Sequence, residues 1–91
     1  MNIGTIIKDA RIKKGISQKS LATLIGCDVS FICKVEKNEK NISLEKLKAL
    51  SSHIEIDLFK LKIEYYSHKI NSLFENEDIE FKNRVLKMMI E

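Results

Sequence analysis

Apolar residues recur at helical spacing from the start of the chain. The first set lies at positions i, i+3, i+4 and i+7, which predicts an amphipathic helix over residues 3–14. This set consists of Ile3, Ile6, Ile7 and Ala10. Gly15 ends the helix, because glycine readily takes the left-handed conformation that follows a helix C-terminus.

Two short helices with a glycine between them follow. The first is expected over about residues 18–25, with Ser17 as its N-cap. The second is expected over about residues 29–37, with Asp28 as its N-cap. Since Gly26 supplies a tight turn between them, the two segments are expected to form a helix-turn-helix unit.

Three further helices are predicted in the rest of the chain. Asn38 takes the place of a glycine after the third helix, and Ser43 caps a fourth. Asp57 caps a longer helix over about residues 58–74, and a sixth helix is expected near residues 78–90. The pattern therefore predicts an all-α fold.

The longer helix carries apolar residues spaced 4, 3, 4 and 3 positions apart, as in a coiled-coil seam. They are Phe59, Ile63, Tyr66, Ile70 and Leu73. Such a seam packs on another helix, either in the same chain or in a second subunit. We favour a second subunit, because 91 residues offer little other core to cover the seam. The predicted dimer interface consists of Leu58, Phe59, Ile63, Tyr66 and Ile70.

Composition agrees with a helical chain. The sequence has no proline, whereas average usage predicts roughly four or five in this length. It contains no apolar run of the roughly 18 residues that span a membrane, and its N-terminus lacks the layout of a signal peptide. We therefore expect a cytoplasmic protein. Cys27 and Cys33 match no common zinc-ligand spacing and are expected to be reduced thiols.

Positive charge is concentrated in the first half of the chain. Residues 1–50 hold ten Lys or Arg against five Asp or Glu, and residues 51–91 hold six against eight. The overall net charge of +3 conceals this difference. The basic half is the candidate surface for a polyanionic partner, although surplus lysine on solvated helix faces is also common.

The sequence offers no arrangement of residues that indicates catalysis. It has no nucleophile elbow, phosphate-binding loop or carboxylate dyad. His53 and His68 have no His, Cys or carboxylate partner at metal-ligand spacing. We expect a protein that is not an enzyme and has no catalytic residue, metal site, cofactor or small-molecule ligand.

Several sequence fragments occur in a fixed order over residues 3–61. They are Arg11-Ile12-Lys13-Lys14-Gly15-Ile16-Ser17-Gln18, Leu21-Ala22, Ile25-Gly26, Ile32-Cys33-Lys34-Val35-Glu36 and Asn41-Ile42-Ser43-Leu44. In this order and spacing they resemble the lambda-repressor-like (Cro/XRE-type) helix-turn-helix family, and within it the controller proteins of restriction-modification systems. The resemblance implies a five-helix DNA-binding domain over residues 1–66, with an extended fifth helix. Residues 67–91 are expected to form a helical extension of the same compact domain that supports dimerisation.

The resemblance also implies roles for individual residues. In this family the third helix lies in the major groove and the second crosses the DNA backbone. Arg11 and Glu36 are implied to form a partly buried structural ion pair. The base-reading positions are Val29, Ser30, Cys33 and Lys34. The candidate phosphate-binding positions are Ser17, Gln18, Lys19, Lys37, Asn38, Lys40 and Asn41.

These observations predict a homodimeric transcriptional regulator, a repressor or autoregulator, that binds a palindromic DNA operator. A restriction-modification controller protein is the subgroup that the resemblance favours. The alternative is an antitoxin-type protein-interaction module whose acidic C-terminal half binds a partner protein. The expected partners are double-stranded DNA and a second copy of the chain, and no membrane is involved.

Overall fold

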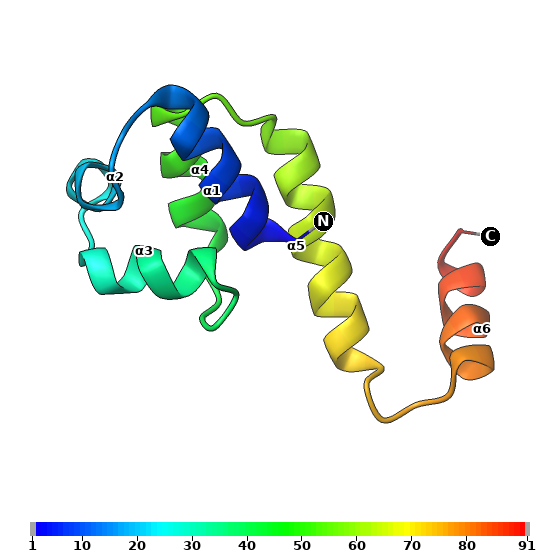
Figure 1. Cartoon of the computed structure of the whole chain (residues 1–91). Coiled ribbons are helices and arrows are strands. Elements are labelled where there is room, and N and C mark those ends of the chain that lie inside the picture. Colours follow the sequence, from blue (N-terminus) through cyan, green and yellow to red (C-terminus); the bar gives the residue numbers. More distant parts are fainter. Residues whose placement is uncertain (1, 91) are drawn as a thin grey trace.

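The computed structural model describes residues 2–90. Within these residues it contains six α-helices and no β-strand, which confirms the all-α prediction. The helices are α1 (Ile3–Lys14), α2 (Gln18–Ile25), α3 (Val29–Glu36), α4 (Leu44–His53), α5 (Leu58–Leu73) and α6 (Ile79–Ile90) (Figure 1).

Most helices begin at the expected capping residues. Side-chain oxygens of Ser17, Ser43 and Asp57 accept hydrogen bonds from backbone N–H groups in the first turns of α2, α4 and α5. Asp28 is the N-cap residue of α3, but its side chain makes no capping hydrogen bond. The N-terminus of α3 is therefore not stabilised by the side chain that the sequence pointed to.

Left-handed backbone conformations end the first three helices. Gly15 and Gly26 have φ angles of 79° and 71°, and Asn38 has a φ of 63°. Glycine adopts this conformation at little cost, and asparagine is among the few other residues that tolerate it. These residues let the chain change direction within a few positions, so that α1 and α2 both pack on α3.

Helices α1 to α5 enclose one hydrophobic core. Helix α2 lies against α3 and α4, α1 lies against α3 and α5, and α4 lies against α5. The N-terminal half of α5 closes the bundle through Leu61, which is fully buried. The buried apolar residues are Ile7, Leu21, Ala22, Ile32, Val35, Ile42, Leu47, Leu50, Ile54 and Leu61.

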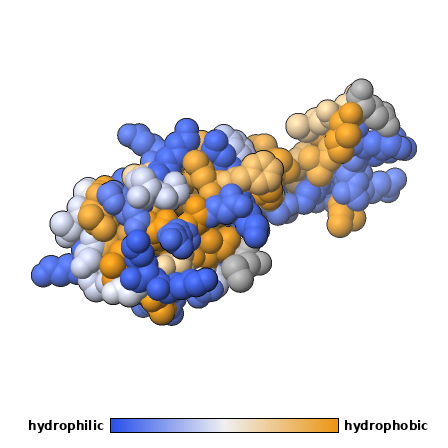
Figure 2. Space-filling view, turned by 90° about the horizontal axis from the view of Figure 1, so that it is seen from above, coloured by the Kyte–Doolittle hydropathy of each residue, from blue (hydrophilic) through white to orange (hydrophobic). Residues whose placement is uncertain are grey.

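The last helix stands apart from this core. Helix α5 extends beyond the bundle, and after a turn at its far end α6 runs back in roughly the opposite direction, apart from the core (Figure 1). At the turn, the rings of Phe74 and Phe81 meet edge to face with centroids 6.3 Å apart, and Lys82 Nζ donates to Asn71 Oδ1. Helix α6 contributes no buried residue. This differs from the expectation that residues 67–91 belong to the compact domain, and Figure 2 shows hydrophobic residues on the surface of the projecting end.

Candidate nucleic-acid interface

Helix α3 is buried on one side and exposed on the other. Ile32 and Val35 point into the core, as expected. The four predicted base-reading residues form two pairs, each spaced four positions apart, which places them together on the other side of the helix. Cys33 is half-buried, and the exposed members are Val29, Ser30 and Lys34. The packed side of α3 thus fixes the orientation of the opposite side. We call the four residues on that side the α3 strip: Val29, Ser30, Cys33 and Lys34.

This strip carries few hydrogen-bonding groups. Lys34 is a donor only, Ser30 donates or accepts, and Val29 offers apolar contact. A lysine suits the O6 and N7 acceptors of guanine, and a valine suits the methyl group of thymine. No side chain on the strip has the paired donor and acceptor of an amide or the fork of a guanidinium. The strip is therefore suited to limited hydrogen-bond reading combined with apolar contact and DNA shape.

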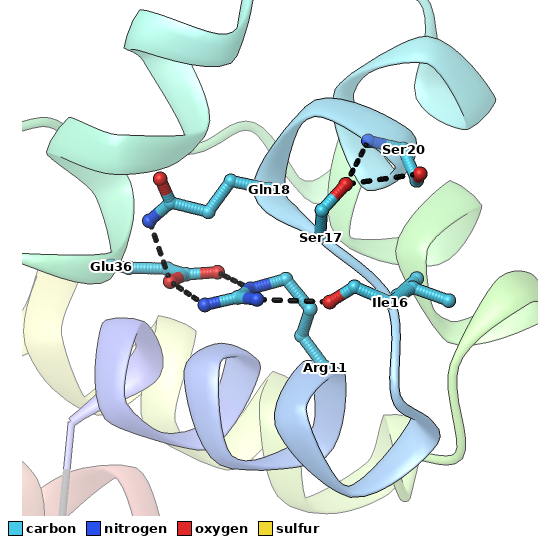
Figure 3. A network of polar contacts seen from close by, with 6 residues as sticks. All are labelled: Arg11, Ile16, Ser17, Gln18, Ser20 and Glu36. Atoms are coloured by element: carbon cyan, nitrogen blue, oxygen red, sulfur yellow. Dashed lines mark hydrogen bonds and ion pairs between the residues drawn. The ribbon is translucent and has the colours of Figure 1, made fainter.

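Arg11 and Glu36 form the ion pair that the resemblance implied (Figure 3). Arg11 Nε and Nη2 donate to the two carboxylate oxygens of Glu36 at 2.7 and 3.0 Å. Arg11 Nη1 donates to the carbonyl oxygen of Ile16 at 2.9 Å. Hydrogen bonding to Glu36 raises the pKa of the Arg11 guanidinium, while burial acts in the opposite direction. Because Glu36 is only 6% exposed, these donors hold a buried charge and fix α1 against α3.

Gln18 belongs to the same network (Figure 3). Its Nε2 donates to Glu36 Oε1 at 3.0 Å, so the amide group that we expected to face a phosphate already has a partner within the chain. The carbonyl oxygen of the amide is only an acceptor, so one N–H of the same NH₂ group is the donor that the side chain keeps for a phosphate. Ser17 is also occupied, because its Oγ caps the N–H of Ser20. Free backbone N–H groups at the start of α2 and the exposed Lys19 remain suited to an anion there.

The loop after α3 carries the remaining predicted phosphate contacts. All of them are exposed, and they are Lys37, Asn38, Lys40 and Asn41. Asn38 has a partner within the chain, since its Oδ1 accepts the backbone N–H of Gly4 at 3.2 Å. The two lysines and Asn41 therefore offer the freer side chains at this end of α3.

The structure adds one basic residue that the sequence analysis missed. Lys46 lies in the first turn of α4, and its Nζ is 4.7 Å from the centroid of the Phe31 ring in α3. The two residues are 15 positions apart and belong to different helices, so no local spacing relates them. Only the tertiary fold, which brings the first turn of α4 to Phe31, places this lysine close to the predicted interface.

The predicted dimer residues occupy an open face of α5. Phe59 is 70% exposed, and Ile63 and Tyr66 are each 50% exposed. Leu58 and Ile70 are half-buried. The same helix directs Leu61 into the core, so the exposed seam lies on a different side from the packed one. Within residues 2–90, Phe59, Ile63 and Tyr66 thus keep half or more of their surface exposed, and their role in a dimer stays a prediction.

The two cysteines and the potential metal ligands show no arrangement that indicates a further site within residues 2–90. Cys27 and Cys33 are free and half-buried, and burial raises the pKa of the Cys27 thiol. Between residues 2 and 90, no three His, Cys, Asp or Glu side chains gather in a way that suits a metal ion. In the same range, no helix combines the length and apolar character that crossing a membrane requires.

Two comparisons with known proteins match this geometry. A family model described as "Helix-turn-helix" matches residues 7–61, which run from α1 into α5. The crystal structure of the restriction-modification controller protein C.AhdI from Aeromonas hydrophila is similar, with 34% sequence identity and a TM-score of 0.59. The similarity covers 64% of this chain and 84% of that one. Among curated proteins, the chain has no significant match.

Proposed function

The chain belongs to the helix-turn-helix family and is a DNA-binding regulator, and on that premise we propose that it represses or autoregulates transcription from a palindromic operator as a homodimer. The observation that carries the proposal is the outer strip of α3. Val29, Ser30 and Lys34 face solvent together, while Ile32 and Val35 anchor the opposite side in the core. A rigid helix with one free, partly basic face is the form that enters the major groove.

Flanking groups support the same orientation. The exposed Lys19 lies at the start of α2, and Lys37, Lys40 and Asn41 follow α3. Phosphate contacts on both sides of a recognition helix set its register on the duplex but carry no sequence information. Sequence preference is then left to the α3 strip and to DNA shape.

A dimer is the natural extension of this arrangement. One recognition helix covers only a few base pairs, and related domains place two such helices about 34 Å apart on successive turns of the groove. The exposed seam of Phe59, Ile63 and Tyr66 offers an apolar surface for a second copy. Two copies related by a two-fold axis bind a two-fold symmetric site, which is the reason for proposing a palindrome.

The similarity to C.AhdI favours one subgroup. That protein is a restriction-modification controller, and the similarity reaches 34% identity over 84% of its length. We place this chain in the same subgroup and expect its operator to lie close to its own promoter in the cytoplasm of the host.

The proposal is tested by titrating the purified protein against DNA from upstream of its own gene at several salt concentrations, followed by footprinting. The expected result is a protected site with two-fold symmetry, and an affinity that falls steeply as salt rises. A random duplex of equal length is the control. Equal affinity for both duplexes contradicts the proposal.

An antitoxin-type interaction module is the second candidate, and one observation favours it. Helix α6 exposes large apolar side chains that no segment within residues 2–90 covers. The most exposed are Ile79, Met88, Met89 and Ile90. Surfaces of this kind mark protein interaction sites. The apolar surface of α6 therefore suits either a different partner protein or a second copy of the chain.

A further inference from the structure

A basic hollow lies beside the outer strip of α3. Phe31 forms part of its wall, and Ser30 and Lys34 of the strip line it as well. Lys40 reaches it from the loop after α3, and Lys46 reaches it from the first turn of α4. Three lysines from three different segments therefore line the same hollow as this aromatic ring. We call this set the Phe31 cluster: Phe31, Lys34, Lys40 and Lys46.

The ring of Phe31 positions two of these ammonium groups. Lys46 Nζ lies 4.7 Å and Lys40 Nζ 5.8 Å from the ring centroid, both within the distance at which the ring face attracts a cation. Phe31 is itself half-buried and packs on the core, so the platform is fixed. The lysines are thus held near one another without hydrogen bonds that would occupy their N–H groups.

The cluster keeps its positive charge. No carboxylate within residues 2–90 forms an ion pair with Lys34, Lys40 or Lys46. The one acidic residue that lines the hollow is Asp28, at the start of α3. A phenylalanine ring holds an ammonium group without neutralising it, whereas a carboxylate would cancel its charge. Like charges held close together repel, and an anion between them relieves that repulsion.

The position of the cluster identifies the anion. Ser30 and Lys34 belong both to this hollow and to the strip that faces the bases. When α3 lies in the major groove, the anionic groups next to the base edges are the phosphates that border the groove. We infer that Lys40 and Lys46, held on Phe31, form a binding site for a DNA backbone phosphate, and that Lys46 is therefore a DNA-contacting residue. This inference rests on the proposed function.

The matched pair Lys46→Gln and Lys48→Gln tests the inference. Both residues lie in α4 and both changes remove one positive charge, but Lys48 is exposed and does not line the hollow. Affinity is measured for the operator and for a random duplex at four or more salt concentrations. For Lys46→Gln we expect affinity to fall roughly fivefold to tenfold on both duplexes. The slope of log affinity against log salt should decrease by about 1.8, because each of the two copies in the dimer loses one phosphate contact worth about 0.9. For Lys48→Gln we expect both quantities to stay near the wild-type values.

A third variant isolates the ring. Phe31→Leu keeps all three lysines and an apolar side chain of similar size, but removes the cation–π contacts. We expect the salt slope to remain near that of the wild type, since the charges remain, and the affinity to fall on both duplexes. Thermal unfolding of each variant checks that the fold is retained.

The outcomes distinguish a failure of the phosphate-site inference from a failure of the proposed function. A wild-type protein that binds the operator, with Lys46→Gln indistinguishable from Lys48→Gln, overturns the inference and leaves the proposed function intact. Loss on the operator alone overturns it too, because a phosphate contact affects all sequences alike. A wild-type protein that prefers no DNA sequence overturns the proposed function, and the phosphate site with it.

Discussion

Asn38 holds the first turn of α1 against the end of α3. Its Oδ1 accepts the backbone N–H of Gly4 at 3.2 Å, and its own backbone has a φ of 63°. A Cβ atom at Gly4 would overlap Asn38 Oδ1 and the carbonyl oxygen of Val35. The two helices therefore approach as closely as glycine alone permits, and the recognition helix is anchored at its C-terminal end.

Gly4→Ala is expected to destabilise the protein by about 1–3 kcal/mol, because the added methyl group forces apart two packed backbone segments. Helix propensity by itself predicts the opposite sign, with alanine favoured by up to about 1 kcal/mol. Urea unfolding measures the difference. Thr5→Ala, in the same turn, is the control and should change stability by only about 0.5 kcal/mol. A Gly4→Ala protein more stable than the wild type would contradict the close approach.

Arg11→Met is expected to cost about 3–5 kcal/mol of stability, since it leaves the buried Glu36 carboxylate without its main partner. Lys13→Met, at an exposed position of the same helix, should cost less than about 0.5 kcal/mol. Denaturant unfolding measures both, and DNA binding should fall only in proportion to the unfolded fraction. If Arg11→Met keeps full stability but loses DNA binding, the pair is a functional contact and not a structural one.

Lys34→Ala is expected to relax sequence preference, because Lys34 is the strongest donor on the α3 strip. The loss of discrimination should be about 1–3 kcal/mol at the base pair it contacts. Lys37→Ala is the comparison, and it should weaken binding to operator and random DNA equally. Competition titrations with single-base operator variants make the measurement. An equal loss on all sequences for Lys34→Ala would assign Lys34 to a phosphate.

Ile63→Glu is expected to dissociate the dimer, because it places a carboxylate in the centre of the exposed seam. The dimer dissociation constant should rise at least about tenfold, which corresponds to about 1.4 kcal/mol. Lys60→Glu is the control, since it lies on the same helix outside the seam and changes the net charge by more. Sedimentation equilibrium reports the association state. If Ile63→Glu and Lys60→Glu show the same dimer dissociation constant, this face of α5 is not the dimer interface.

Limited proteolysis distinguishes two binding partners for the apolar surface of α6: a second copy of the chain and a different protein. If a second copy covers this helix, cleavage after the glutamates between α5 and α6 should slow as protein concentration rises. The glutamates concerned are Glu75 and Glu77. The Ile63→Glu variant should be cleaved quickly at every concentration. Rapid cleavage of the wild-type dimer would instead favour an absent protein partner and hence the antitoxin-type alternative.

Helix limits were predictable because they depend on residues a few positions apart. Ser17 and Ser43 cap the turns that follow them, and Gly15 and Asn38 take left-handed conformations that few other residues tolerate. The buried side of α3 followed from the spacing of Ile32 and Val35. For Arg11 and Glu36, 25 positions apart, only the family resemblance indicated the contact.

The sequence by itself thus determined an all-α chain, its capped helices and the residues exposed on α3. Tertiary structure decided which polar groups are still free to meet DNA. It pairs the Gln18 amide with Glu36, brings Lys46 to Phe31, and leaves α6 outside the core. Local spacing predicts the face of a helix on which a residue lies, but the neighbour of that face depends on how distant segments pack. That packing minimises buried unpaired charge and exposed apolar surface over the whole chain at once.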